Sequence, residues 1–150
     1  MEKLLIVNFT HWIILSYFML KLTRKVEYAL IALRHIQGKD VSQISTTKEI
    51  AEQYSLPVEL LAKVLQLLSK QDIIRAVQGP QGGYIPKAEL KNINLIRFIE
   101  MIEGPTGLVN CNINADCLQI DNCNIRLPIK KINDNIRNIF RNITLKEITL

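Results

Sequence analysis

The stretch TTKEIAEQYSLPVELLAKVLQLLSK, residues 46–70, decides the fold of this chain. Its first part predicts a short helix over residues 48–54, because Thr46 or Thr47 can cap the helix and Glu49 can complete a capping box. Ser55-Leu56-Pro57 then predicts a tight turn. Proline suits the first position of a helix but cannot continue the preceding one.

An amphipathic helix over residues 57–70 is expected after this turn. One side is apolar, and the outward side is a polar stripe made of Glu59, Ala62, Lys63, Gln66 and Lys70. A short helix, a tight turn and an amphipathic helix make up a helix-turn-helix, whose second helix enters the major groove of DNA. Helix spacing alone leaves an ordinary small helical bundle open as the alternative.

The residues that follow predict a β-hairpin. Residues 73–77 have the composition of a strand, the GPQGG sequence over 79–83 suits a turn with positive φ, and residues 84–85 form the returning strand. A hairpin directly after a helix-turn-helix is the order of a winged helix. The hairpin, or wing, is then placed to contact the DNA backbone or the minor groove.

Helices are also expected on both sides of this unit. Apolar residues recur at three- and four-residue steps from Lys21 until Gly38 closes the run, and Asn94 caps a helix over residues 95–103. After Pro128, one apolar stripe predicts a helix that needs a partner; we expect a two-fold dimer seam, with the domain's own core as the alternative. This stripe consists of Ile129, Ile132, Ile136, Ile139, Phe140 and Ile143.

The expected fold is mainly α with a small β-hairpin wing: a winged helix-turn-helix domain plus a C-terminal dimerisation helix. The DNA-binding domain is expected over residues 19–103, a cysteine loop over 104–127, and the dimerisation helix and tail over 128–150. Residues 1–18 form an apolar leader. Its apolar run is about as long as a short membrane span, but polar residues interrupt it, so no membrane partner is expected and an anchor stays as the alternative.

Composition favours an intracellular protein with an anionic partner. The chain has 150 residues, a formal net charge of +5 and three cysteines. A modest positive charge is compatible with nucleic acid, and an odd cysteine count argues against a secreted disulfide framework. The only histidines are His11 and His35, so no obvious Cys–His catalytic pair exists and no enzyme activity or small-molecule substrate is expected.

The three cysteines, Cys111, Cys117 and Cys123, are separated by five residues each within one polar segment. Structural zinc sites favour cysteines two to four residues apart, whereas iron–sulfur clusters are held by thiolates with varied spacings. The spacing is therefore compatible with a metal or cluster site that lacks its fourth ligand. Thiol redox sensing and unligated cysteines remain the alternatives.

Taken together, these residues resemble the Rrf-two family of winged-helix regulators over residues 19–149. The resemblance is carried by KLTRKVEYAL at 21–30, LPVELLAKVLQLL at 56–68, GPQGGY at 79–84, the C-x5-C-x5-C loop and the closing ITLKEI at 143–148. It implies a homodimer that binds double-stranded operator DNA. It also implies an iron–sulfur cluster, [2Fe–2S] or [4Fe–4S], which many members carry and whose state modulates DNA binding.

The resemblance also assigns residues to the cluster. Cys111, Cys117 and Cys123 match its ligands. Some members place a histidine three positions after the third cysteine, where this chain has Arg126, which cannot ligate a metal at neutral pH. Other members use an acidic residue on the first helix of the opposite subunit, and the matching position here is Glu27. A solvated surface carboxylate is the alternative for Glu27.

For DNA, the family's contacts come from the longer helix of the pair and the wing. Glu59, Lys63 and Gln66 can reach base edges or phosphates. The cations suited to phosphates are Lys21, Arg24, Lys25 and Lys48. The family's wing often carries an arginine where this chain has Gln78, so minor-groove insertion would need Arg75 instead.

The predicted function is a transcription regulator that senses iron, redox state or nitric oxide through the cluster. The alternative is a thiol-based or metal-ion sensor without a cluster. The expected location is the cytoplasm, with the stroma of a plastid as the alternative.

Overall fold

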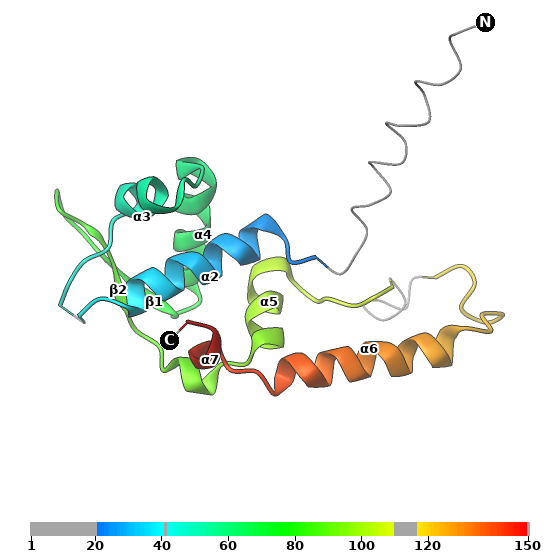
Figure 1. The fold of residues 1–150 in the computed structure, drawn as a ribbon. Coiled ribbons are helices and arrows are strands. Elements are labelled where there is room, and N and C mark those ends of the chain that lie inside the picture. Colours follow the sequence, from blue (N-terminus) through cyan, green and yellow to red (C-terminus); the bar gives the residue numbers. More distant parts are fainter. Residues whose placement is uncertain (1–20, 41, 110–116, 150) are drawn as a thin grey trace, which may run out of the picture.

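The computed structural model describes residues 21–40, 42–109 and 117–149 (Figure 1). Its elements follow in the order α2 Arg24–Gln37, α3 Thr47–Tyr54, α4 Val58–Lys70, β1 Ile74–Val77, β2 Gly83–Pro86, the 3₁₀ helix η1 Leu90–Asn92, α5 Leu95–Glu103, α6 Arg126–Arg141 and α7 Leu145–Thr149. The predicted class, mainly α with a small hairpin, is confirmed. Within the described ranges, no helix is long and apolar enough to cross a membrane.

The helix-turn-helix is formed by α3 and α4, as its sequence predicts. Thr46 caps α3, and Glu49 completes the capping box. The helix ends at Ser55, whose φ of 52° lies in the left-handed region, and α4 begins directly after Pro57. The buried face of α4 is made of Leu61, Val64, Leu65 and Leu68. This face packs in the same core as Leu33 of α2 and Phe98 of α5, so the opposite face of α4 points outward.

The wing is an antiparallel hairpin whose register runs from Ile74 opposite Pro86 to Val77 opposite Gly83. Ser45, in the linker before α3, adds one further bridge to Tyr84 through backbone hydrogen bonds of 2.9 Å in both directions. Gly83 makes this approach possible, because a Cβ there would lie 2.5 Å from the carbonyl oxygen of Ser45. The linker, the wing and α3 are therefore held as one unit.

Two helix starts and one additional short helix differ from the sequence-based expectations. The first described helix begins at Arg24, because Thr23 caps it by accepting from the Val26 N–H at 3.3 Å. The last long helix, α6, begins at Arg126 rather than at Pro128. Proline is tolerated there because the N–H groups of a first turn have no partner within the helix. The short helix α7 was not expected from the sequence.

The helix α7 returns the chain to the core (Figure 1). The Leu145 N–H donates to the Ile93 carbonyl, and the Leu95 N–H donates to the Ile143 carbonyl, both at 2.8 Å. Leu145 is fully buried. The end of α6 is thereby tied to the body.

An ion cluster joins the end of α2 to the start of α3. Glu49 contacts Lys39, and His35 lies 3.0 Å from the same carboxylate. The hydrogen bond from Lys39 is the main reason that the pKa of Glu49 lies below its ordinary value, with smaller contributions from the Thr46 N–H and His35. The folded state therefore favours the ionised carboxylate.

We predict that Glu49→Gln lowers the free energy of unfolding at pH 7 by roughly 0.2–1 kcal/mol, the usual value of an exposed ion pair. Glutamine keeps the capping box but loses the charge. Because the folded pKa of Glu49 is depressed, its stabilisation is present above the unfolded pKa and is lost as the pH falls through the folded pKa. Urea unfolding at pH 7 and at low pH should show the difference shrinking on acidification.

We predict that Gly83→Ala lowers the free energy of unfolding by about 1–3 kcal/mol, because the new methyl group forces the linker and β2 apart. Gly38→Ala is the matched control. Its φ is −75°, and the nearest atom to a Cβ there, the Arg34 carbonyl oxygen, lies 3.3 Å away. Thermal or urea unfolding of both variants checks the prediction, and equal stability of the two would contradict it.

Candidate functional site

The outward face of α4 carries the polar stripe that the sequence predicts. Glu59, Lys63 and Gln66 are exposed, whereas the leucines of the other face are buried. Val58, at the first turn, is 52% exposed. Because α4 is fixed by its buried face, this stripe is presented on a rigid element, as contacts to base edges in a groove require.

The wing lies next to α4 in the chain and presents polar groups. Arg75 on β1 and Gln78 at the tip are both exposed. Gly79 follows with a φ of 121°, a value that only glycine adopts readily. The hairpin therefore has the short, tight tip that a wing needs in order to reach a DNA backbone.

The cations expected to meet phosphates lie in two places. Lys48 is on the first turn of α3 and lies 3.8 Å from Glu52. The others lie at the start of α2, where Arg24 pairs with Glu27 at 2.9 Å and Lys25 lies 3.9 Å from Glu103 of α5. Lys21 precedes them and is exposed. The start of α2 is thus adjacent to the end of α5, from which the cysteine segment departs.

Two of the three cysteines lie within the described residues. Cys117 and Cys123 are free thiols of intermediate exposure, in a run of turns that leads into α6. The Cys117 thiol lies 3.6 Å from the Gln119 side-chain oxygen. Cys111 lies outside the described residues. Over residues 21–40, 42–109 and 117–149, no group of three or more His, Cys, Asp or Glu is placed to hold a metal ion.

Glu27, the candidate fourth ligand, lies on the first turn of α2. Its side chain is 29% exposed, and one carboxylate oxygen accepts from Arg24. Arg126, at the position where some relatives carry a histidine, begins α6 and is exposed.

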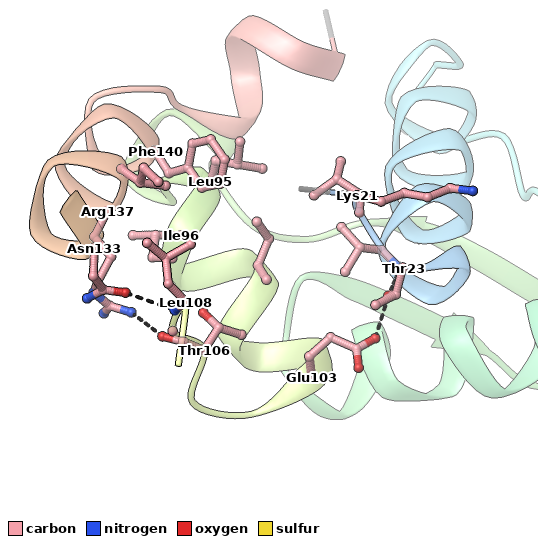
Figure 2. Close-up of a pocket in the computed structure, with 15 residues that line it drawn as sticks. Lys21, Thr23, Leu95, Ile96, Glu103, Thr106, Leu108, Asn133, Arg137 and Phe140 are labelled. Carbon is pink, nitrogen blue, oxygen red and sulfur yellow. Dashed lines mark hydrogen bonds between the residues drawn. The ribbon is translucent and has the colours of Figure 1, made fainter. Parts of the chain in front are cut away.

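An apolar groove of about 460 Å³ lies between the start of α2, α5 and α6 (Figure 2). Its apolar walls include Leu22, Ile96, Ile99, Ile136 and Phe140. Beside it, α6 exposes a further row of apolar side chains, with Ile132 at 48% and Ile139 at 59%. One chain thus carries both an exposed row of apolar side chains on α6 and an apolar groove, a combination that two copies can satisfy mutually.

Two polar residues of α6 that line this groove were not predicted from the sequence. Asn133 is only 6% exposed and accepts from the Leu108 N–H at 3.2 Å. Arg137 donates to Glu100 at 2.7 Å and to the Thr106 carbonyl at 2.9 Å. The sequence feature that could have indicated burial of Asn133 is its position on the apolar side of the helix, four residues after Ile129 and three before Ile136.

The family model described as "Iron-dependent Transcriptional regulator" matches residues 22–149. The chain belongs to the Rrf2 (Rrf-two) family. It is 29% identical, over 82% of its length and 87% of the relative's, to an HTH-type transcriptional regulator of Aquifex aeolicus. Its function class is therefore that of a DNA-binding transcription regulator, as the sequence predicts.

Solved structures of Rrf2 relatives have the same fold. IscR of T. potens is 25% identical with a TM-score of 0.66, and the match covers 86% of this chain and 85% of IscR. CymR, the global cysteine regulator of B. subtilis, is 24% identical with a TM-score of 0.67 over 87% of this chain and 97% of CymR. These likenesses confirm the winged-helix architecture.

Proposed function

We propose that the chain is a homodimeric regulator that binds operator DNA and senses iron, redox state or nitric oxide through an iron–sulfur cluster held by Cys111, Cys117 and Cys123. The observation that carries the proposal is the placement of the two described thiols. Cys117 and Cys123 are free, partly accessible, and on turns that lead directly into α6. A change at the sulfurs therefore acts on the helix expected to form the dimer.

The donor chemistry fits a cluster. Cysteine thiolates are the usual ligands of iron–sulfur clusters, and accessibility allows loading. We propose Glu27 of the partner subunit as the fourth ligand, since Arg126 has no lone pair to offer. When bound, the cluster supplies a group that reacts with oxidants or nitric oxide, while the chain positions the sulfurs. Such chemistry needs reducing conditions, in keeping with the cytoplasm.

The dimer is proposed to form through α6. Exposed apolar side chains on this helix, including Ile132 and Ile139, are unfavourable in water. Docking α6 of one copy beside the groove of the other buries both surfaces at once. The two copies of α4 are then related by a two-fold axis, which suits half-sites one helical turn apart.

DNA is proposed to contact the exposed stripe of α4 and the wing. Gln66 is the residue that we assign to base edges in the major groove, with Glu59 beside it, and Lys63 is assigned to a phosphate at the edge of that groove. Phosphates are assigned to Lys21, Arg24, Lys25 and Lys48. In the wing, we assign Arg75 and Gln78 to the backbone or minor groove.

The second candidate is a thiol-based sensor that carries no cluster. It is favoured by the same free thiols, because a partly exposed cysteine can also be oxidised or modified directly. Anaerobic purification distinguishes the two candidates. Iron with acid-labile sulfide supports the cluster, whereas colourless protein with reactive thiols supports the alternative.

We predict that Cys117→Ala abolishes iron–sulfur loading and changes the affinity for a duplex selected from a random-sequence pool. Iron and sulfide analysis together with fluorescence anisotropy measure both effects. Asn122→Ala, an exposed change in the same run of turns, is the control. Loss of iron with unchanged affinity would remove the sensing part of the proposal.

We predict different losses for two substitutions on α4. Lys63→Ala should weaken binding to all duplexes and reduce the slope of log affinity against log salt by about 0.9 if Lys63 meets one phosphate. Gln66→Ala should cost about 1–3 kcal/mol on the selected duplex alone, because a lost base contact removes discrimination. Lys131→Ala, exposed on α6, is the control and should leave both quantities unchanged.

A further inference from the structure

The start of the cysteine segment, Thr106–Leu108, is hydrogen-bonded to α6, and we call it the first leg of the segment. The Leu108 N–H donates to the Asn133 side-chain oxygen at 3.2 Å, and the Thr106 carbonyl accepts from Arg137 at 2.9 Å (Figure 2). Asn133 and Arg137 are one turn apart on the same face of the helix. The second leg of the segment runs into the start of α6 through Cys123. One helix therefore holds both legs of the segment that carries the sulfurs.

The burial of these contacts favours a single arrangement of the first leg. Asn133 is 6% exposed, at the edge of an apolar groove. A buried amide without a hydrogen bond is costly, so Asn133 favours the arrangement in which Leu108 is held. The Arg137 side chain is 26% exposed and serves two acceptors with one terminal nitrogen.

From α6 the polar contacts continue to α5 and α2. Arg137 pairs with Glu100 at 2.7 Å. Glu103, one turn later on α5, accepts from the Thr23 hydroxyl at 2.6 Å, although the two residues are 80 positions apart. The Thr23 hydroxyl oxygen in turn accepts from the Val26 N–H and so caps α2. The contact between α5 and α2 is therefore made at the cap of the helix that carries Arg24 and Lys25.

We infer that these five side chains form a loop bridge, which positions the cysteine segment and passes its state to the start of α2. The loop bridge consists of Asn133, Arg137, Glu100, Glu103 and Thr23. This inference rests on the proposed function, since it names the residues through which the loop acts on DNA. A displacement of the Thr106–Leu108 leg strains the contacts to α6, which alters the pairing of Glu100 on α5. Glu103 lies on the same helix and contacts both the capping hydroxyl of Thr23 and the Lys25 ammonium group.

Substitutions in the loop bridge distinguish a purely structural role from a role in transmission. If the bridge only stabilises the fold, its loss lowers stability but leaves the response of DNA affinity to the cysteines unchanged. If the bridge transmits the state of the cysteine segment, its loss reduces that response, because coupling between two sites is itself a free energy. Both the ordering of the leg and the response must therefore be measured.

The first measurement uses reduced, metal-free full-length protein and needs no DNA. We expect Asn133→Leu, which keeps the side-chain volume, and Arg137→Met to raise the hydrogen-exchange rate of the Leu108 amide at least about tenfold, as expected for local opening made about 1.4 kcal/mol easier. Arg141→Met is the matched control, because Arg141 donates to Asn138 on its own helix. Unchanged exchange in both variants overturns the positioning role.

The second measurement compares the affinity for the selected duplex before and after alkylation of the cysteines with N-ethylmaleimide. Typical couplings correspond to ratios of about 5–150, and we expect wild type and Arg141→Met to lie in this range. Arg137→Met should bring the ratio close to one. If it fails to fold, Arg137→Lys keeps the cation but not the planar guanidinium, and an intermediate ratio is expected.

The outcomes separate the two proposals. If the wild-type protein does not bind duplex DNA, the proposed function is wrong. Hydrogen exchange still decides in that case whether Asn133 and Arg137 position the leg. A wild-type ratio of one, or a wild-type ratio retained in Arg137→Met and Arg137→Lys, overturns transmission through the loop bridge. Faster Leu108 exchange together with a reduced ratio supports it.

Discussion

The packing of α2 in the centre of the molecule is the constraint on which the other elements depend. This helix contacts α4, α5, α7 and the wing strand β2. Its buried positions include Ala29 and Ala32, whose small side chains leave room for several neighbours to approach. The outward stripe of α4 and the base of the wing are therefore placed by one buried helix. A change in the position of α2 therefore affects the placement of α4 and of the wing together.

The helix-turn-helix and the wing could be predicted because their signals are local. The capping box of Thr46 and Glu49, the proline after the turn and the glycines of the hairpin each act within a few residues. The apolar face of α4 has a clear helical period. None of these features requires knowledge of a distant part of the chain.

The features that the sequence did not reveal depend on distant residues. The helix α7 spans only Leu145–Thr149, too short for a periodic signal, and it is stabilised by pairing with the residues before α5. The roles of Asn133 and Arg137 could not be predicted from the sequence, because their partners Leu108 and Thr106 lie 25 and 31 residues away along the chain. For the proposed cluster, the sequence indicates which thiols belong together. It does not position them, and Cys111 lies outside the described residues.

The bridge between Ser45 and Tyr84 has a consequence for how chains of this kind can vary in length. The hairpin tip can gain residues beside Gly79, since no atom lies within 4 Å of the position that a Cβ would take there, whereas at Gly82 a Cβ would lie 2.5 Å from the Val77 carbonyl oxygen. The linker before α3 is not free in this way. One inserted residue there would shift the pairing by a single position and turn Ile44 to the other face of the small sheet. Related sequences should therefore differ in length beside Gly79 at the hairpin tip, while the number of residues from the linker to the Thr46 cap stays constant.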